Sequence, residues 1–296
     1  MQKYTIMGFK GIYKDKSSAT KIGILFLLIF VSVILLTLVG SAIVLFFSDF
    51  GLSQDLSNQV AVNYLKLLQL FSAIGLFVAP TLLYAYLTDF DYKLLFNFKR
   101  QSAFLVIVIM MLITPFIGWL LEMNMSIPFP DWILRLGNDS EKIVESFLKM
   151  NHLGDLLFNL LVIAIVPAIG EELLFRGYLQ QSFSKWLSNP HVAIIVTAVL
   201  FSAIHLHFQG FFPRFILGVL LGYLFYWSGS LWLPILAHFA NNAQAVIFSY
   251  PTFKVDSGVY SVLSDVEVDP MMALFSFASV VVLLFMFYKT VSIKKD

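Results

Sequence analysis

The ten residues PAIGEELLFR, at positions 167–176, place two carboxylates and a guanidinium inside an apolar helical segment. The segment begins near Leu156 and is typical of a membrane-spanning helix. A charge at the bilayer centre costs about 2.5–3.5 kcal/mol on insertion scales, so it is rarely kept without a function. Glu171, Glu172 and Arg176 therefore mark the centre around which we expect the chain to fold.

The composition of the chain is that of a membrane protein. Of its 296 residues, 59% are hydrophobic and 12% are charged, whereas soluble domains carry about 25% charged residues. The net charge of +1 does not favour a nucleic-acid partner. Because the chain has no cysteine, disulfides and thiol chemistry are excluded. We predict one integral membrane domain over residues 1–296, with the lipid bilayer as its surroundings.

The apolar runs predict an all-α polytopic bundle of about eight transmembrane helices. The sixth run carries Gly218 and Gly222, four residues apart, and this small-residue face predicts that the fifth and seventh helices approach closely. The polar segment 122–155 is predicted to hold a short helix near 140–150, over the site or on the membrane surface. The predicted spans are residues 22–47, 67–87, 102–121, 156–187, 191–207, 214–227, 231–248 and 271–288.

Lysine and arginine residues are unevenly divided between the two sides of this predicted bundle. Eight spans put both termini on one side, and that side receives thirteen of the 19 Lys and Arg residues, against six on the other. The positive-inside rule assigns the richer side to the cytoplasm. We therefore predict a multi-pass protein with both termini in the cytoplasm.

The three charges of the opening stretch do not share one helical face. Glu172 and Arg176 lie at i and i+4, with the acid N-terminal to the base, which is the favourable order for an ion pair. Glu171 is rotated about 100° from Glu172 at 3.6 residues per turn. We expect a pair between Glu172 and Arg176 and an available carboxylate at Glu171. The alternative is an ion-pair network that only locks helix packing.

Two further polar pairs follow on later helices, again at i, i+4 spacing. Phe201 precedes His205, and His238 precedes Asn242. The midpoint of positions 171 and 205 falls in the predicted turn at Ser-Asn-Pro, residues 188–190, so both residues lie at equal depth in an antiparallel hairpin. We predict that Glu171, His205, His238 and Asn242 converge on one cavity.

These side chains suit two chemistries, and the residues alone leave both open. In the first, Glu171 and His205 activate a water molecule as general bases, while His238 and Asn242 donate hydrogen bonds to an oxyanion. In the second, Glu171, His205 and His238 bind Zn²⁺, which lowers the pKa of its bound water. His-Glu-x-x-His is absent, which excludes the standard zincin helix.

Taken together, the motifs EE-x-x-x-R (171–176), F-x-x-x-H (201–205) and H-x-x-x-N (238–242) resemble those of the CAAX prenyl endopeptidase and bacteriocin-processing family of intramembrane proteases. The resemblance covers residues 156–248, the predicted catalytic core. It implies an intramembrane endopeptidase that hydrolyses a peptide bond of a membrane-associated substrate, such as a prenylated protein or a leader peptide.

By this resemblance, Glu171 and His205 activate the water, His238 and Asn242 form the oxyanion hole, and Glu172 with Arg176 supports the site. Members are described as metalloendopeptidases, and a metal-free glutamate mechanism is also proposed, so the resemblance leaves a divalent cofactor such as zinc open. We expect a protein of the bacterial inner membrane.

Two other functions compete with proteolysis. Intramembrane Glu and His residues also relay protons, which allows a proton-coupled transporter, although the chain shows no paired inverted repeats with broken helices. A non-catalytic membrane or bacteriocin-immunity protein would use the polar groups for packing alone. The sequence predicts no particular oligomeric state.

Overall fold

The computed structural model describes residues 8–47, 56–90, 96, 100–253 and 268–292, and within them every regular element is a helix. The predicted all-α class is therefore confirmed. In chain order the elements are α1 (Ser18–Phe47), α2 (Gln59–Ala73), η1 (Ile74–Val78), α3 (Ala79–Thr88), α4 (Arg100–Leu112), α5 (Thr114–Met125), α6 (Asp131–Leu148), α7 (Leu153–Asn159), η3 (Leu160–Ile165), α8 (Val166–Glu172), η4 (Leu173–Leu179), α9 (Gln180–Leu187), α10 (Pro190–Ala203), η5 (Phe208–Gly210), α11 (Phe211–Ser228), α12 (Trp232–Phe248) and α13 (Pro270–Ser292).

Helix length limits how many of these elements cross a bilayer. Within the described residues, five continuous helices are long and apolar enough, and a sixth span arises if α4 and α5, bent by 42°, count as one. Each of the eight predicted segments contains a helix, but the fifth, residues 191–207, is helical only to Ala203, so His205 lies beyond the helix end. Helix α10 has 14 residues and α12 has 17. At 1.5 Å per residue, α10 rises only about 21 Å, short of a hydrocarbon core of about 30 Å. Eight full spans are therefore not confirmed.

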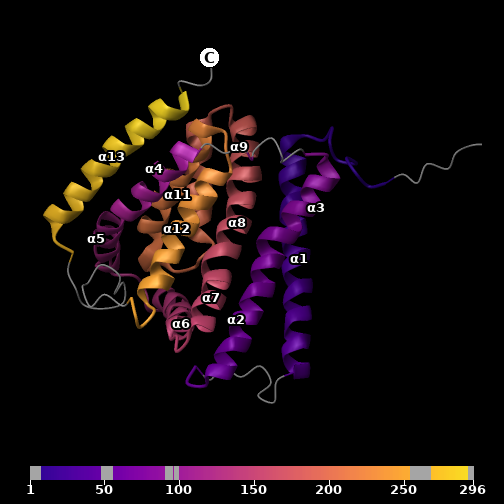
Figure 1. Cartoon of the computed structure of the whole chain (residues 1–296). Coiled ribbons are helices and arrows are strands. Elements are labelled where there is room, and N and C mark those ends of the chain that lie inside the picture. Colours follow the sequence, from indigo (N-terminus) through magenta and orange to yellow (C-terminus); the bar gives the residue numbers. More distant parts are fainter. Residues whose placement is uncertain (1–7, 48–55, 91–95, 97–99, 254–267, 293–296) are drawn as a thin grey trace, which may run out of the picture.

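One long helix runs through the middle of the bundle and carries the opening stretch of sequence. It comprises α7, η3, α8, η4 and α9, continuous from Leu153 to Leu187. In Figure 1, α1 to α3 stand on one side of it, and α4, α11, α12 and α13 on the other. The start of α1 and the end of α13 lie at the same end of the molecule (Figure 1). The α8 segment packs against both η1 and α12, so its charges face protein.

A proline explains the irregular winding of this helix just before the charges. Pro167 lies in the first turn of α8, directly after the π-helical η3. Proline has no backbone N–H, so it cannot donate to the carbonyl of Ile163, four residues earlier. The side-chain amide of Asn242 on α12 donates to this oxygen at 3.0 Å. A neighbouring helix thus supplies the hydrogen bond that the proline removes.

The segment after α5 forms a longer surface helix than expected. The sequence predicted residues 140–150, whereas α6 covers Asp131–Leu148 and lies at the end of the bundle near α2 and η5. Its last turn is held by Phe147, whose ring centroid is 5.7 Å from the ammonium of the fully buried Lys66 on α2. Cation–π attraction of this kind attaches α6 to the membrane helices.

One glycine allows the close approach of α1 and η1. A Cβ at Gly75 of η1 would lie 2.8 Å from the carbonyl oxygen of Ser32 and 2.9 Å from Cα of Val33, both backbone atoms of α1. We expect Gly75→Ala to separate α1 from η1 and to lower the apparent Tm in detergent, because overpacking typically costs about 1–3 kcal/mol.

The matched control for that measurement is Gly23→Ala, because Gly23 also lies in a helix and a Cβ there meets nothing within 4 Å. Its Tm is expected to stay at or above that of the parent, since alanine is the better helix former. Equal Tm values for the two variants would contradict the close approach of α1 to η1.

Candidate active site

The charged stretch folds into a buried ion pair with a third partner. A guanidinium Nη1 of Arg176 donates to Oε1 of Glu172 at 2.7 Å, as the i, i+4 spacing predicted. Both side chains are fully buried. The other Nη of Arg176 donates to the carbonyl of Gly218 on α11 at 2.9 Å. Buried charges require such pairing, because the desolvation of an isolated ion is prohibitive.

His238 connects this pair to the second carboxylate. Its Nδ1 lies 2.9 Å from Oε1 of Glu172, and its Nε2 lies 3.9 Å from Oε2 of Glu171. Because an ionised carboxylate only accepts hydrogen bonds, Nδ1 is the donor to Glu172. The ring is thereby held with Nε2 facing Glu171. Oε2 of Glu171 and Oε2 of Glu172 are both buried without a hydrogen-bond partner, but the ion pair with Arg176 is made by Glu172, so Glu171 is the carboxylate left available.

The ring of Phe201 lies between the two imidazoles and the guanidinium of the site. Its ring centroid lies 5.6 Å from that of His205 and 5.7 Å from that of His238. The guanidinium carbon of Arg176 lies 4.7 Å from the same centroid. One aromatic side chain therefore sets the separation of both imidazoles and the guanidinium. The sequence motif contained Phe201, but its spacing alone assigned it no role.

The end of α10 fixes the orientation of His205. The helix ends at Ala203, and the final carbonyls of a helix lack backbone donors. Nδ1 of His205 lies 2.9 Å from the carbonyl oxygen of Phe201. A carbonyl oxygen can only accept, so Nδ1 carries the proton. In the neutral ring this leaves Nε2 of His205 as an acceptor, which is the state a base requires.

Asn242 lies one helical turn beyond His238 and makes different contacts from those predicted. Its Nδ2 donates to Ile163, and its Oδ1 accepts from Nδ2 of Asn241 at 3.1 Å. The described contacts therefore join Glu171, Glu172, Arg176, Phe201, His205 and His238 into one cluster, while Asn242 contacts the same long helix two turns before Glu171.

The predicted metal ligands do not form a coordination group in this conformation. Among the residues that the structure describes, no three His, Cys, Asp or Glu side chains lie close enough together to hold one ion. Nδ1 of His238 and Nδ1 of His205 are hydrogen-bonded, so only the Nε2 atoms could coordinate, and with Glu171 they do not form such a group. The residues thus do not fit the zinc alternative, and we derive no step through a metal.

The small-residue face of α11 does more than permit close packing. A Cβ at Gly218 would lie 3.1 Å from Cβ of Ala198, and one at Gly222 would lie 2.8 Å from Cγ2 of Ile194, so the face packs against α10. Sequence reasoning had expected the fifth and seventh helices to meet there. The carbonyl of Gly222 also accepts from Nε2 of Gln180 at 3.1 Å, parallel to the bond from Arg176 to Gly218.

The first turn of α11 contains a second basic group that sequence reasoning missed. Arg214 donates through Nη1 to the carbonyl of His207 at 2.9 Å and through Nη2 to Nδ1 of the same residue at 2.6 Å. It lies one helical turn before Gly218, whose carbonyl accepts from Arg176. The available signal was its position: it is the last charge before a charge-free stretch, residues 215–253.

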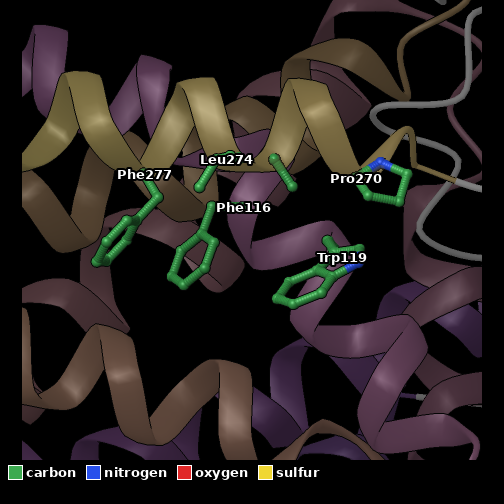
Figure 2. A pocket seen from close by; sticks show the side chains of 6 residues that line it. Phe116, Trp119, Pro270, Leu274 and Phe277 are labelled. Carbon is green, nitrogen blue, oxygen red and sulfur yellow. The ribbon is translucent and has the colours of Figure 1, made fainter.

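A separate cleft of about 250 Å³ lies between α5 and α13 (Figure 2). Its walls are apolar, and none of them belongs to a helix of the charged cluster, so it is not a candidate for the chemistry. The lining residues are Phe116, Trp119, Pro270, Ala273, Leu274 and Phe277.

Comparison with known proteins identifies the region that carries the cluster. Residues 153–244 match the family model described as type II CAAX prenyl endopeptidase Rce1-like. The chain is 29% identical over 89 residues to an uncharacterized protein, YpbD, of Bacillus subtilis (strain 168), which is 29% of this chain and 42% of that protein. It is 30% identical over 113 residues to an uncharacterized 24.3 kDa protein of Escherichia coli, which is 37% of this chain and 52% of that protein.

The chain thus spans about half or less of the length of these two relatives. No solved structure matches it. The family match supports a protease of the CAAX type, and the apolar helices support a multi-pass membrane protein.

The buried pair gives a test by double-mutant cycle. We expect Glu172→Met and Arg176→Met each to destabilise the protein by about 3–5 kcal/mol, because each leaves the other charge buried and unpaired. The double variant is expected to lose much less than the sum of the two. The measurement is thermal unfolding in detergent.

The exposed pair of Lys10 and Asp89, 3.1 Å apart, serves as the control cycle. Its coupling is expected to be about 0–1 kcal/mol. Strict additivity at positions 172 and 176 would show that their contact does not support the fold.

Proposed function

We propose that this protein is an intramembrane endopeptidase of the CAAX type whose general base is Glu171. The observation that supports the proposal most strongly is the division of labour between adjacent carboxylates. Oε1 of Glu172 accepts from both Arg176 and His238. Glu171 has no ion pair with the guanidinium, its Oε2 is buried without a hydrogen-bond partner like Oε2 of Glu172, and it faces an imidazole at 3.9 Å. An acid kept in this state inside a bundle is suited to proton transfer.

In the proposed reaction, a water molecule is held between Glu171 and Nε2 of His205. Glu171 removes a proton from the water as its oxygen attacks the carbonyl carbon of the scissile peptide bond. The orientation of His205 supports this role, since its Nδ1–H is directed to a backbone carbonyl and its Nε2 is free to accept. The carbon–oxygen bond forms while the carbonyl π electrons move to oxygen, which gives a tetrahedral oxyanion.

His238 and Asn242 are the proposed donors to this oxyanion. Two carboxylates flank His238, so a protonated ring can point Nε2–H at the oxyanion with its charge compensated. The Asn242 amide has two N–H bonds, of which one is directed to Ile163. The second is available to the substrate. Fixed donors of this kind stabilise developing charge most effectively where water is excluded.

The intermediate then collapses with cleavage of the carbon–nitrogen bond. The proton taken up by Glu171 passes to the leaving amine nitrogen, and a new carboxyl group and a new amine are formed. Glu172 and Arg176 stay outside these transfers and hold His238 in place. The substrate is proposed to be a membrane-associated peptide or protein, because the site lies on membrane helices. Both termini on the cytoplasmic side of a bacterial inner membrane remain our prediction for the topology.

The proposal is tested by Glu171→Gln, which keeps the shape of the side chain and removes its basicity. We expect cleavage of a synthetic peptide library by purified protein to fall about 10²–10⁴-fold, the usual worth of a general base. Products are measured by mass spectrometry. Glu145→Gln, on the exposed side of α6, is the matched control and is expected to cleave like the parent.

Full cleavage by Glu171→Gln would overturn the assignment of the base. If neither the parent nor the variant cleaves any peptide, and proton-coupled uptake into proteoliposomes depends on Glu171, the protein is a carrier instead.

A further inference from the structure

Arg214 lies where a cation is electrostatically unfavourable. It occupies the first turn of α11, and the N-terminal end of a helix carries partial positive charge. Among the described residues, no carboxylate lies within 4.0 Å of its guanidinium, since the ion pairs found there involve other residues. The side chain is only partly exposed. A partly buried cation in such a place needs a counter-charge that the described chain does not provide at contact distance.

The surroundings of Arg214 are nevertheless shaped to hold it. Both of its terminal nitrogens donate to His207, one to the backbone carbonyl and one to the ring. Since guanidinium only donates, Nδ1 of His207 accepts, and two bonds to one residue fix the plane of the guanidinium. A guanidinium has five N–H donors, so the remaining ones are left to face a ligand.

Two glycines provide the space for this arrangement. A Cβ at Gly210 would collide with Nη2 of Arg214, and a Cβ at Gly137 of α6 would collide with the ring of His207. Three segments therefore build the position of the guanidinium: α6, the loop after α10, and the start of α11. Arg214 lies one helical turn before Gly218, whose carbonyl accepts from Arg176, and it contacts His207, two residues after His205, which places it near the catalytic cluster.

We infer that Arg214 is a specificity-determining residue that binds a carboxylate of the substrate within a few residues of the scissile bond. The inference rests on the proposed function and deepens it by naming a substrate class. A carboxylate matches the planar, fixed donors of a guanidinium and supplies the missing negative charge. Its source is either the C-terminus of the peptide or an acidic side chain.

The test uses matched synthetic peptide libraries with the purified full-length protein. One library ends in a free carboxylate and the second in a carboxamide. The third library also ends in a carboxamide, but it contains Asp and Glu at the positions where the second library has Asn and Gln. We expect the parent to cleave one carboxylate-bearing library about 10–100-fold better, in kcat/KM, than the neutral library, the worth of one hydrogen bond to a charged group. The carboxylate-bearing library with the higher kcat/KM identifies the source of the carboxylate.

The variant Arg214→Gln is expected to lose this preference mainly through a higher KM while it still cleaves the neutral library, because uniform binding has been removed. Arg214→Lys is expected to keep part of the preference. Arg135→Gln, at an exposed arginine of α6, is the control and keeps all of it.

Three results would overturn the inference and leave the proposed function standing. The parent could cleave charged and neutral libraries alike, Arg214→Gln could retain the preference, or it could lower kcat equally for every library. The last result would assign Arg214 to the transition state instead of to substrate binding.

Failure of the protease proposal itself is recognised separately, because then no library is cleaved by the parent. The carboxylate site is still tested in that case by binding. Retention of the libraries on immobilised Glu171→Gln protein is compared with retention on Glu171→Gln/Arg214→Gln. Equal retention of the carboxylate libraries on the two proteins contradicts the site.

Discussion

The contact between Glu172 and Arg176 is the constraint on which the rest of the core depends. A fully buried guanidinium can be tolerated only if its charge and its donors are satisfied, and three helices contribute to that. The long central helix supplies the carboxylate, α11 supplies the carbonyl of Gly218, and α10 supplies the ring of Phe201. The same carboxylate then orients His238 of α12. Contacts to one ion pair thus position four helices. Because Glu172 makes this pair, Glu171 is left outside it.

Much of this arrangement could be predicted from the sequence, because it is local. Hydropathy marked the helical segments, and the i, i+4 spacing indicated that Glu172 pairs with Arg176 and that Glu171 faces elsewhere. The turn at residues 188–190 is also found, with Ser188 in the left-handed region at φ 53° and Asn189 capping α10. These features depend on neighbours within a few residues of one another.

Features that depend on contacts between distant segments could not be read in the same way. The count of eight spans is not confirmed, because apolar composition does not show that α10 ends after 14 residues. Pro167 was visible, but nothing local indicated that Asn242 would donate to the carbonyl of Ile163. Arg214 appeared only as one positive charge among 19, since its relation to His207, Gly210 and α6 arises when three segments meet.

The shortness of α10 also determines what surrounds the backbone next to His205. A helix that ends about 21 Å from its start is shorter than a hydrocarbon core of about 30 Å. The backbone of residues 204–207, between α10 and η5, would need protein or water as partners at membrane depth. Asn124 of α5 supplies such partners directly after this stretch by donating to the carbonyl of Phe208 and accepting from the N–H of Phe212. Helices α5 and α6 both contact η5, so protein and not lipid covers this part of the backbone near His205.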